Sequence, residues 1–482
     1  MSTPRTGATG TQPAEVAPTG EPPRPRGRVR RRAWTGAAAA LVVVLVVVLV
    51  VALVVQDDDP PGRSADGTGD TDTGGGGAGG VLPQEGVALL DLPRIPWEGG
   101  PEYWSRFPAA VAAGWTDPSF FPVVAWYDGI SSDEEVQYDR GVGINTYIGM
   151  DAATPYSLFA DNGVFWMGSR LNESFPEDGA NWPASFLDDE VDGRFTPEDG
   201  RAHLEQLRED LPPDRPAYAN FTQTVVSTDM SDADAEAYVN DYSDIVSVDM
   251  YWYTIPFCDL RPFRGSVYLQ PIREDTCRTA SSYGAVVEML RERDAADGRL
   301  QAVWQFVELL NGGPGEGPFT AEIEPGQLQG AVMSSLINEA RGIVWFNQSL
   351  SGPCQGGNLI RLSQVQQDFC GAEQVAAAAE VNGVVRDLAA VLNTQSYEWD
   401  AGPGLDTMLK AHDGSAYLFA MVDGSQDPGE RTLRLPPGVE GTTAEVLFED
   451  RSLPIDDGVV VDTFAEEHTW HVYRVALAED QP

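Results

Sequence analysis

Over most of the chain, short apolar runs alternate with longer amphipathic stretches. Eight runs rich in β-branched and aromatic residues have the length of buried strands, and stretches with a helical period separate them. The predicted strands are 121–126, 144–148, 164–167, 184–187, 217–221, 245–250, 302–307 and 342–346. This alternation predicts a parallel sheet, and eight such strands over about 300 residues predict a (β/α)8 TIM barrel of the α/β class. An open doubly wound sheet is the structural alternative.

Helix start signals support the amphipathic stretches. Thr196, followed by Pro197 and Glu198, is typical of an N-cap with proline in the first turn. Further helices are predicted at 231–242, 282–293, 327–340 and 373–392. The helices that should follow the first three strands are short or poorly defined in the sequence.

The pattern changes after Pro403 to a period of two with frequent turn residues. That pattern is typical of antiparallel strands and contains no helical segment of note. The sequence therefore predicts two domains, a barrel over residues 81–403 and a small antiparallel β-sandwich over residues 404–482.

The chain begins with a different organisation. Residues 33–55 are apolar and uncharged, long enough to cross a bilayer. Six arginines lie just before them, within residues 24–32, and Asp57, Asp58 and Asp59 follow, so a single transmembrane helix with a cytoplasmic amino terminus is predicted. Residues 1–32, rich in Pro, Thr, Gly and Arg, should be a disordered cytoplasmic tail, and residues 56–80, with almost no apolar side chains, a flexible extracellular linker. The alternative is a cleaved signal peptide, which usually has a shorter apolar region.

The net charge of the chain excludes one class of function. The formal net charge is −43, with 74 acidic side chains and Lys410 as the single lysine, and such a surface repels phosphates, which excludes nucleic-acid binding.

Four cysteines in an exported chain predict two disulfides. Sequence order favours Cys258–Cys277 and Cys354–Cys370 among three connectivities. No CxxC spacing is present and the four histidines are scattered, so no metal site is expected.

Candidate chemistry comes from the rule that barrel active sites form at the carboxyl ends of the strands. Two carboxyl groups facing each other across an aromatic cleft suit glycosidic cleavage, because one protonates the leaving oxygen while the other attacks or activates water. The residues at the predicted strand ends are Asp188, Asp189 and Glu190 (strand four), Asp249, Tyr251, Trp252 and Tyr253 (strand six), Glu308 (strand seven), and Trp345, Phe346 and Asn347 (strand eight).

Each candidate also has a structural interpretation. The acidic run 188–190 fits a solvated loop start. Glu308 ends a run buried on both faces, where a carboxylate is disfavoured unless it is paired or functional. Four tryptophans on different strands fit either a core or sugar-stacking walls: Trp126, Trp166, Trp304 and Trp345.

These segments resemble clan A of the retaining glycoside hydrolases, which are TIM barrels, many with a trailing β-sandwich. FLDDEVDG resembles the strand-four motif of that clan, which implies an acid/base role for Glu190, and VWQFVE implies a nucleophile role for Glu308. VDMYWY is similar to the strand-six region where the clan places a tyrosine near the nucleophile, which implies Tyr251 or Tyr253. GIVWFN resembles the strand-eight segment with a tryptophan under the sugar, which implies Trp345.

The sequence departs from the clan at two positions. Asp189 stands where an asparagine commonly precedes the acid/base, and no arginine ends strand two.

The resemblance implies a cell-surface retaining glycoside hydrolase that cleaves an extracellular polysaccharide or glycoconjugate with two glutamates and no cofactor. The substrate contacts that follow from this hypothesis are Asp189, Trp126, Trp166, Asp249, Tyr251, Tyr253, Trp304, Trp345 and Asn347. A non-catalytic carbohydrate-binding surface protein on the same scaffold is the alternative, and a purely structural wall-associated domain is a third.

Overall fold

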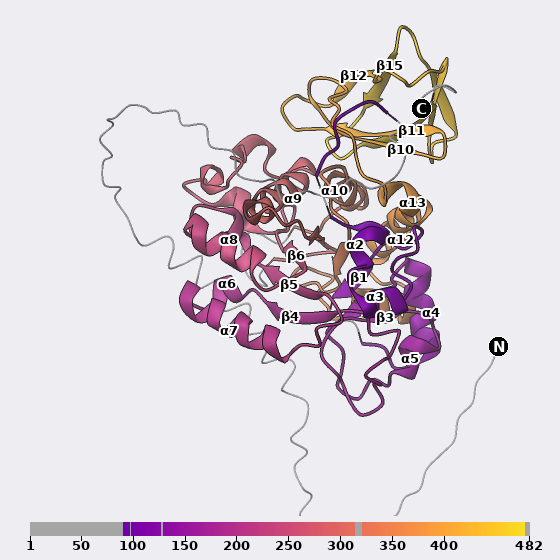
Figure 1. Cartoon of the computed structure of the whole chain (residues 1–482). Coiled ribbons are helices and arrows are strands. Elements are labelled where there is room, and N and C mark those ends of the chain that lie inside the picture. Colours follow the sequence, from indigo (N-terminus) through magenta and orange to yellow (C-terminus); the bar gives the residue numbers. More distant parts are fainter. Residues whose placement is uncertain (1–89, 97, 127–128, 314–320, 478–482) are drawn as a thin grey trace, which may run out of the picture.

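A computed structural model describes residues 90–96, 98–126, 129–313 and 321–477 (Figure 1). The predicted tail, membrane span and linker of residues 1–80 lie outside these ranges. Within the described residues, no helix combines the length and the apolar character needed to cross a bilayer. Two domains are visible, a barrel of strands and helices and a β-domain drawn in yellow.

All eight predicted barrel strands are confirmed, and all pair in parallel. Their bounds are β1 (Val123–Trp126), β2 (Thr146–Ile148), β3 (Phe165–Trp166), β4 (Ser185–Asp189), β5 (Ala217–Phe221), β6 (Ile245–Val248), β7 (Ala302–Val303) with β8 (Gln305–Glu308), and β9 (Ile343–Phe346). The seventh predicted strand is thus divided into β7 and β8 at Trp304.

The strands close into a ring. Two sheets have the orders β3-β2-β1-β9-β8 and β4-β5-β6-β7. A parallel bridge between Met167 and Ala184 joins β3 to β4. On the other side, the N–H of Trp304 donates to Val246 on β6, and the N–H of Gln305 donates to Gly342 ahead of β9, so the divided strand spans both sheets. This closure excludes the open doubly wound sheet.

Helices cover the outside of the ring. The side chain of Thr196 accepts from the N–H of Asp199 and caps α7, as predicted. Residues 168–184 contain no helix, so the crossover from β3 to β4 is a loop, which explains the weak helical signal there. The helices are α2 (Gly100–Trp104), α3 (Pro108–Ala112), α4 (Asp133–Val142), α5 (Ser157–Ala160), α6 (Val191–Arg194), α7 (Pro197–Asp210), α8 (Asp232–Asn240), α9 (Ser281–Asp294), α10 (Pro325–Ile337), α11 (Leu359–Val365), α12 (Ala372–Asp387) and α13 (Ala389–Leu392).

The amino-terminal end of the barrel is closed by aromatic side chains. Trp104 of α2 packs edge-to-face on Trp115 and lies 6.5 Å from Trp304 between ring centroids. The hydroxyl of Tyr103 donates to the carbonyl of Asp244, just ahead of β6. This plug fills the bottom of the barrel and leaves the opposite end, where the strands finish, for a functional site.

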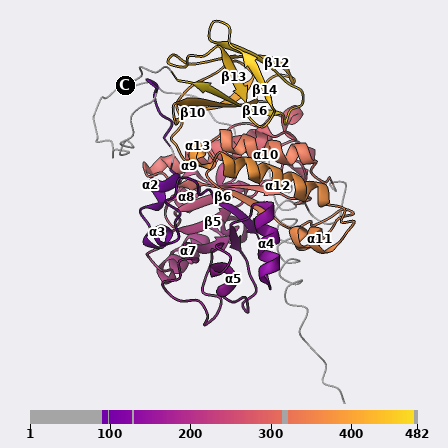
Figure 2. The same cartoon turned by 90° about the vertical axis from the view of Figure 1, so that its right-hand side faces the viewer.

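The β-domain is an antiparallel sandwich, as predicted. One sheet has the order β10 (Leu405–His412), β11 (Ser415–Val422), β16 (Trp470–Ala476), β13 (Thr443–Val446) and β14 (Arg451–Pro454), and the other pairs β12 (Gly429–Arg434) with β15 (Val459–Phe464). It packs over α10 and α13 (Figure 2). Leu90, at the start of the described chain, is buried in the core of this domain, so the chain passes through the β-domain before it forms the barrel.

Candidate active site

Three carboxyl groups gather where β4 and β6 end. Asp189 is the last residue of β4, Glu190 follows it, and Asp249 follows β6. The side chains of Glu190 and Asp249 are hydrogen-bonded to each other, and all three groups are partly exposed. They therefore form an accessible acidic cluster at the carboxyl end of the barrel.

Glu190 has a backbone conformation that is unusual for a residue with a side chain. Its φ of 49° and ψ of 37° lie in the left-handed region, which costs about 1 kcal/mol or more outside glycine. Its N–H donates to the carbonyl of Asn220 on β5, and its carbonyl accepts from Gly193 as α6 begins. These bonds hold a sharp turn that places the side chain at the barrel mouth.

Burial and mutual repulsion raise the pKa of each group in the cluster. The pKa of Glu190 rises to about 8, first because burial disfavours its charge and then because of Asp189. The pKa of Asp189 rises to about 6, an effect opposed by the amide of Asn220, which donates to its Oδ1 at 2.9 Å. The pKa of Asp249 is raised well above its ordinary value by burial and by Glu190. Glu190 therefore keeps its proton near neutral pH, as a general acid must.

Glu308, at the end of β8, lies in a different environment. Its side chain has no exposed surface. The hydroxyl of Tyr283 donates to it and lies 2.8 Å from each carboxyl oxygen, and Thr254 donates to Oε1 at 3.1 Å. Burial raises its pKa to about 8, while these donors and the charge of Arg278 act in the opposite direction. The group is buried but held in one orientation by two side-chain donors.

Tyr251 connects these two parts of the barrel end. Burial raises its pKa well above the ordinary value, and the charges of Asp249 and Glu308 are the next largest causes. Its hydroxyl has no hydrogen-bond partner within the described residues. A Cβ at Gly312 would lie 2.3 Å from its ring, so the segment after β8 packs directly on this tyrosine. The acidic cluster and Glu308 thus both lie close enough to Tyr251 to affect its pKa, and the hydroxyl of this tyrosine is unpaired within the described residues.

The four tryptophans proposed as sugar-stacking walls belong to the core. At most 3 % of each is exposed: Trp126, Trp166, Trp304 and Trp345. The indole N–H of Trp345 donates to Asn382 on α12, so its ring points toward the outer helices and not under a sugar. Trp304 packs between Trp104 and Tyr218 in the barrel interior. As the structure stands, none of these four rings is open to a substrate, because the barrel needs large side chains to fill its interior and its helical interface.

Two other residues predicted to contact the substrate use their polar side chains in hydrogen bonds within the protein. The buried Asn347 accepts from the N–H of Ile360 and donates to Asn358, which fixes the loop after β9. The hydroxyl of Tyr253 donates to Glu467 of the β-domain at 2.7 Å. Neither is free for substrate.

The side chains that donate hydrogen bonds to Glu308 were not among the residues predicted from the sequence. Tyr251 and Tyr253 lie near this carboxyl, but Thr254 and Tyr283 donate to it. Thr254 belongs to the YWYT segment after β6 and was within reach of a sequence argument. Tyr283 lies in the first turn of α9, and no sequence signal marks it, because its position depends on how α9 packs.

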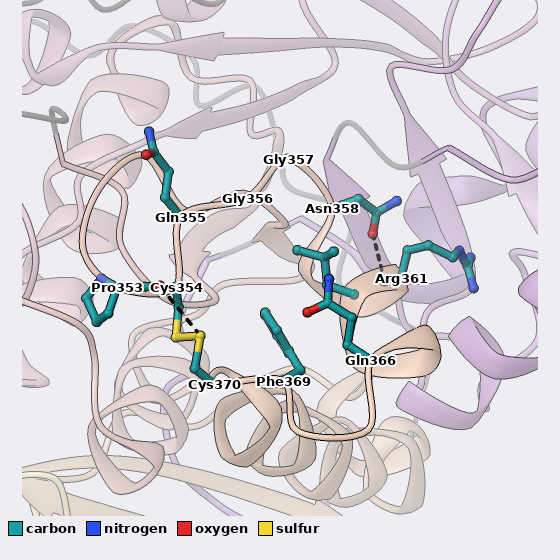
Figure 3. A pocket seen from close by; sticks show the side chains of 11 residues that line it. Pro353, Cys354, Gln355, Gly356, Gly357, Asn358, Arg361, Gln366, Phe369 and Cys370 are labelled. Atoms are coloured by element: carbon teal, nitrogen blue, oxygen red, sulfur yellow. Dashed lines mark hydrogen bonds between the residues drawn. A yellow bond between two sulfur atoms is a disulfide. The ribbon is translucent and has the colours of Figure 1, made fainter. Parts of the chain in front are cut away.

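Both predicted disulfides are present. Cys258–Cys277 closes the loop between β6 and α9, and Cys354–Cys370 encloses α11 after β9. Figure 3 shows the second disulfide at the edge of a pocket of about 370 Å³, with Asn358, Gln366 and Phe369 around it. Both loops follow strand ends and border the same end of the barrel as Glu190. Within the described ranges, no group of His, Cys, Asp or Glu side chains is arranged to hold a metal ion.

Comparisons with known proteins find similarity in three-dimensional structure only. No protein-family model and no curated protein matches the sequence. Similar solved structures include a GH30 endoxylanase from Clostridium papyrosolvens, with a TM-score of 0.43, 8 % identity, and coverage of 81 % of this chain and 98 % of that one. A putative alpha-galactosidase from Bacteroides fragilis has a TM-score of 0.44, 10 % identity, and coverage of 74 % and 80 %.

A glycoside hydrolase family 5 structure from Bacteroides vulgatus has a TM-score of 0.44, 11 % identity, and coverage of 75 % and 90 %. At these scores and identities, no activity or residue role transfers to this chain.

Proposed function

We propose that the protein is a retaining glycoside hydrolase that cleaves an extracellular polysaccharide or glycoconjugate. The observation that carries the proposal is the placement of Glu190 and Glu308 at the same end of the barrel, after the fourth and seventh strands, both close enough to Tyr251 to affect its pKa. Double displacement requires a protonated acid and an ionised nucleophile, and with the pKa of both groups raised to about 8 this combination is present near that pH.

The roles follow from the two environments. Glu190, whose pKa is raised to about 8, protonates the glycosidic oxygen and then, as a carboxylate, takes a proton from water. Glu308 attacks the anomeric carbon, and Tyr283 and Thr254 keep its carboxylate aimed while it is charged. The buried hydroxyl of Tyr251, which is unpaired within the described residues, would pair with a sugar hydroxyl once the site opens.

The proposal places one requirement on the protein. Glu308 has no exposed surface, so the side chains over it must part when the substrate binds. Access to an anomeric carbon therefore depends on a rearrangement around Tyr251 and Gly312, which pack on each other.

The same burial favours a second candidate, a carbohydrate-binding surface protein without hydrolytic activity. In that protein Glu308 would serve only as a buried, hydrogen-bonded part of the barrel. Activity decides between the two candidates, because only the hydrolase turns over a glycoside and loses that turnover when Glu308 is changed.

The test is to assay the purified ectodomain, residues 81–482, on aryl glycosides and polysaccharides. Glu308→Gln should lower kcat at least about 1,000-fold, since the nucleophile is lost. Glu190→Gln should lose most activity on ordinary glycosides but keep the first step on dinitrophenyl glycosides, whose leaving group needs no proton. The exposed Glu198→Gln, on α7, is the matched control. Full activity in Glu308→Gln would refute the nucleophile, and an inverted anomer in the product would refute retention.

We also propose that residues 33–55 anchor the protein in the membrane, with the barrel outside the cytoplasm. The apolar segment with arginines before it and aspartates after it supports this orientation, and two disulfides fit an oxidising compartment. Protease added to intact cells should remove the barrel and leave the amino-terminal tail protected. Protection of the barrel in intact cells, with digestion after lysis, would refute the orientation.

A further inference from the structure

A loop of the β-domain reaches the barrel next to the proposed nucleophile. Residues 465–469 connect β15 to β16, and within them the half-buried carboxylate of Glu467 accepts two hydrogen bonds from the barrel. The hydroxyl of Tyr253 donates to its Oε1 at 2.7 Å, and the N–H of Ala280 donates to its Oε2 at 2.8 Å. One carboxylate thus ties together the segment after β6 and the residue just ahead of α9.

Those two attachment points lie directly behind Tyr283. The rings of Tyr253 and Tyr283 stack with centroids 5.6 Å apart and planes 28° from parallel. The N–H of Tyr253 also donates to the hydroxyl oxygen of Tyr283 at 3.2 Å. Ala280 lies three residues before Tyr283, so its bond to Glu467 fixes the first turn of the helix that carries this tyrosine.

This chain of contacts, called the relay, ends at Glu308, the proposed nucleophile. The hydroxyl of Tyr283 lies within hydrogen-bond distance of both oxygens of Glu308, so contacts run without a gap from Glu467 through Tyr253 and Tyr283 to Glu308. Burial and nearby carboxylates raise the pKa of both tyrosines well above the ordinary value. Both phenols therefore keep their protons and remain donors throughout the pH range in which a glycosidase works.

The loop is seated firmly on the barrel. The N–H of Glu466 donates to the side chain of Thr469, and the N–H of Thr469 donates back to the carbonyl of Glu466. His468 rests on α10, where a Cβ at either Gly326 or Gly330 would lie 2.6 Å from it. At Gly330 the backbone of His468 is also within 3.0 Å, so only glycine allows this approach there, and α10 holds the loop from the other side.

We propose that Glu467 is a positioning residue of the active site, supplied by the β-domain, which holds the carboxyl of Glu308 in place through Tyr253 and Tyr283. The inference rests on the proposed function in one respect, that Glu308 is the nucleophile. It gives the β-domain a role in catalysis in addition to its packing on the barrel.

The first experiment measures Glu308 directly and needs no substrate. The ectodomain is labelled with ¹³C at the glutamate carboxyl, and the Glu308 resonance is identified by its absence in Glu308→Gln. Tyr283 lowers the pKa of Glu308 by donating to it, so Glu467→Ala should raise that pKa by about one pH unit as the donor loosens. Glu466→Ala removes an exposed carboxylate from the same loop and should leave it unchanged. An unchanged Glu308 pKa in Glu467→Ala would overturn the proposal, whether or not the protein is an enzyme.

The second experiment uses activity. Misplacing a reacting group by a fraction of an ångström costs about 10- to 100-fold, so Glu467→Ala should lower kcat by that factor. KM should change less than about threefold, because the proposed sugar contacts stay in place. Tyr253→Phe breaks the same link and should give a similar loss, and the double variant should lose little more. Additive losses, or a change in KM alone, would overturn the relay.

Two further measurements separate the possible failures. Glu467→Gln keeps the side-chain shape but cannot accept from both donors, so it tests the relay if Glu467→Ala reduces the melting temperature. Full activity in Glu308→Gln contradicts the proposed function, whereas an unshifted Glu308 resonance in Glu467→Gln and Tyr253→Phe contradicts only the relay.

Discussion

The hydroxyl of Tyr283 lies 2.8 Å from both carboxyl oxygens of Glu308, although 25 residues separate the two in sequence. Both side chains are fully buried, so neither has water as an alternative partner. Removing the donor would leave a buried carboxyl without a hydrogen bond, which lowers the free energy of unfolding by about 1.5–3 kcal/mol for a charged group. This hydrogen bond therefore contributes both to the stability of the barrel and to its proposed chemistry.

Replacing Tyr283 with phenylalanine should impair catalysis without preventing folding. The variant should lower kcat about 10- to 100-fold, the kinetic equivalent of the lost hydrogen bond, and raise the pKa of Glu308. Steady-state kinetics over a range of pH would measure both effects. Tyr238→Phe removes another buried phenol and is the control. Equal effects of the two substitutions would show that Tyr283 has only a packing role.

The proposed activity should have an optimum near pH 8. Catalysis requires Glu308 ionised and Glu190 protonated, and the pKa of each is raised to about 8. Below that pH Glu308 gains a proton, and above it Glu190 loses one, so kcat/KM should fall on both sides. A pH profile of kcat/KM would test this, and an optimum at pH 5 would contradict the electrostatics of the site.

The fragment of residues 81–482 should become less stable as the pH rises from about 4 to 8. Burial raises the pKa of Asp192 to about 6, of Asp294 to about 7 and of Glu308 to about 8. Between its unfolded and folded pKa values, such a group holds its proton only in the folded state, so stability is present at low pH and is lost as pH rises. Each such group contributes a slope of about 1.4 kcal/mol per pH unit within its window.

Denaturant unfolding at pH 5, 6, 7 and 8 would measure this slope. Asp294→Asn should reduce it between pH 5 and 7, because one buried titrating group is removed while its surroundings keep their shape. Stability that rises over this range would contradict the assignment.

The two disulfides should differ in their effect on activity. On the chain-entropy model, removing either bond costs about 3 kcal/mol of stability. Cys258–Cys277, however, closes the segment between Thr254 and Tyr283, the two donors to Glu308, whereas Cys354–Cys370 borders only the loop after β9. Cys258→Ser with Cys277→Ser should therefore lower kcat, and Cys354→Ser with Cys370→Ser should lower it far less.

Melting curves and kinetics of both double variants, at a temperature where each is folded, would test this difference. A larger loss of activity in the Cys354→Ser, Cys370→Ser variant would contradict this and show that the loop after β9 contributes more to catalysis. Mild reduction of the unaltered protein should lower activity before the barrel unfolds, because the strand pairing depends on neither bond.

Much of the scaffold was predictable because its signals are local. Each barrel strand is an apolar run of a few residues, and Thr196 with Pro197 marks the start of α7 by side-chain chemistry within one turn. The nearest-neighbour cysteine pairs formed because loops of 19 and 16 residues bring them together easily. The position of Glu190 and Glu308 at strand ends followed from the same strand pattern.

The sequence by itself determined the strands, the helix caps, the acidic surface and the two carboxyl groups at strand ends, since each depends on residues close together in the chain. The tertiary structure alone decided which aromatic side chains fill the barrel, that Tyr283 and Thr254 hold Glu308, and that Glu467 reaches the site from 187 residues beyond Ala280. The physical reason is that the direction of a strand side chain and the partner of a buried polar group are set by how curved strands and outer helices pack, and composition and spacing do not encode that packing.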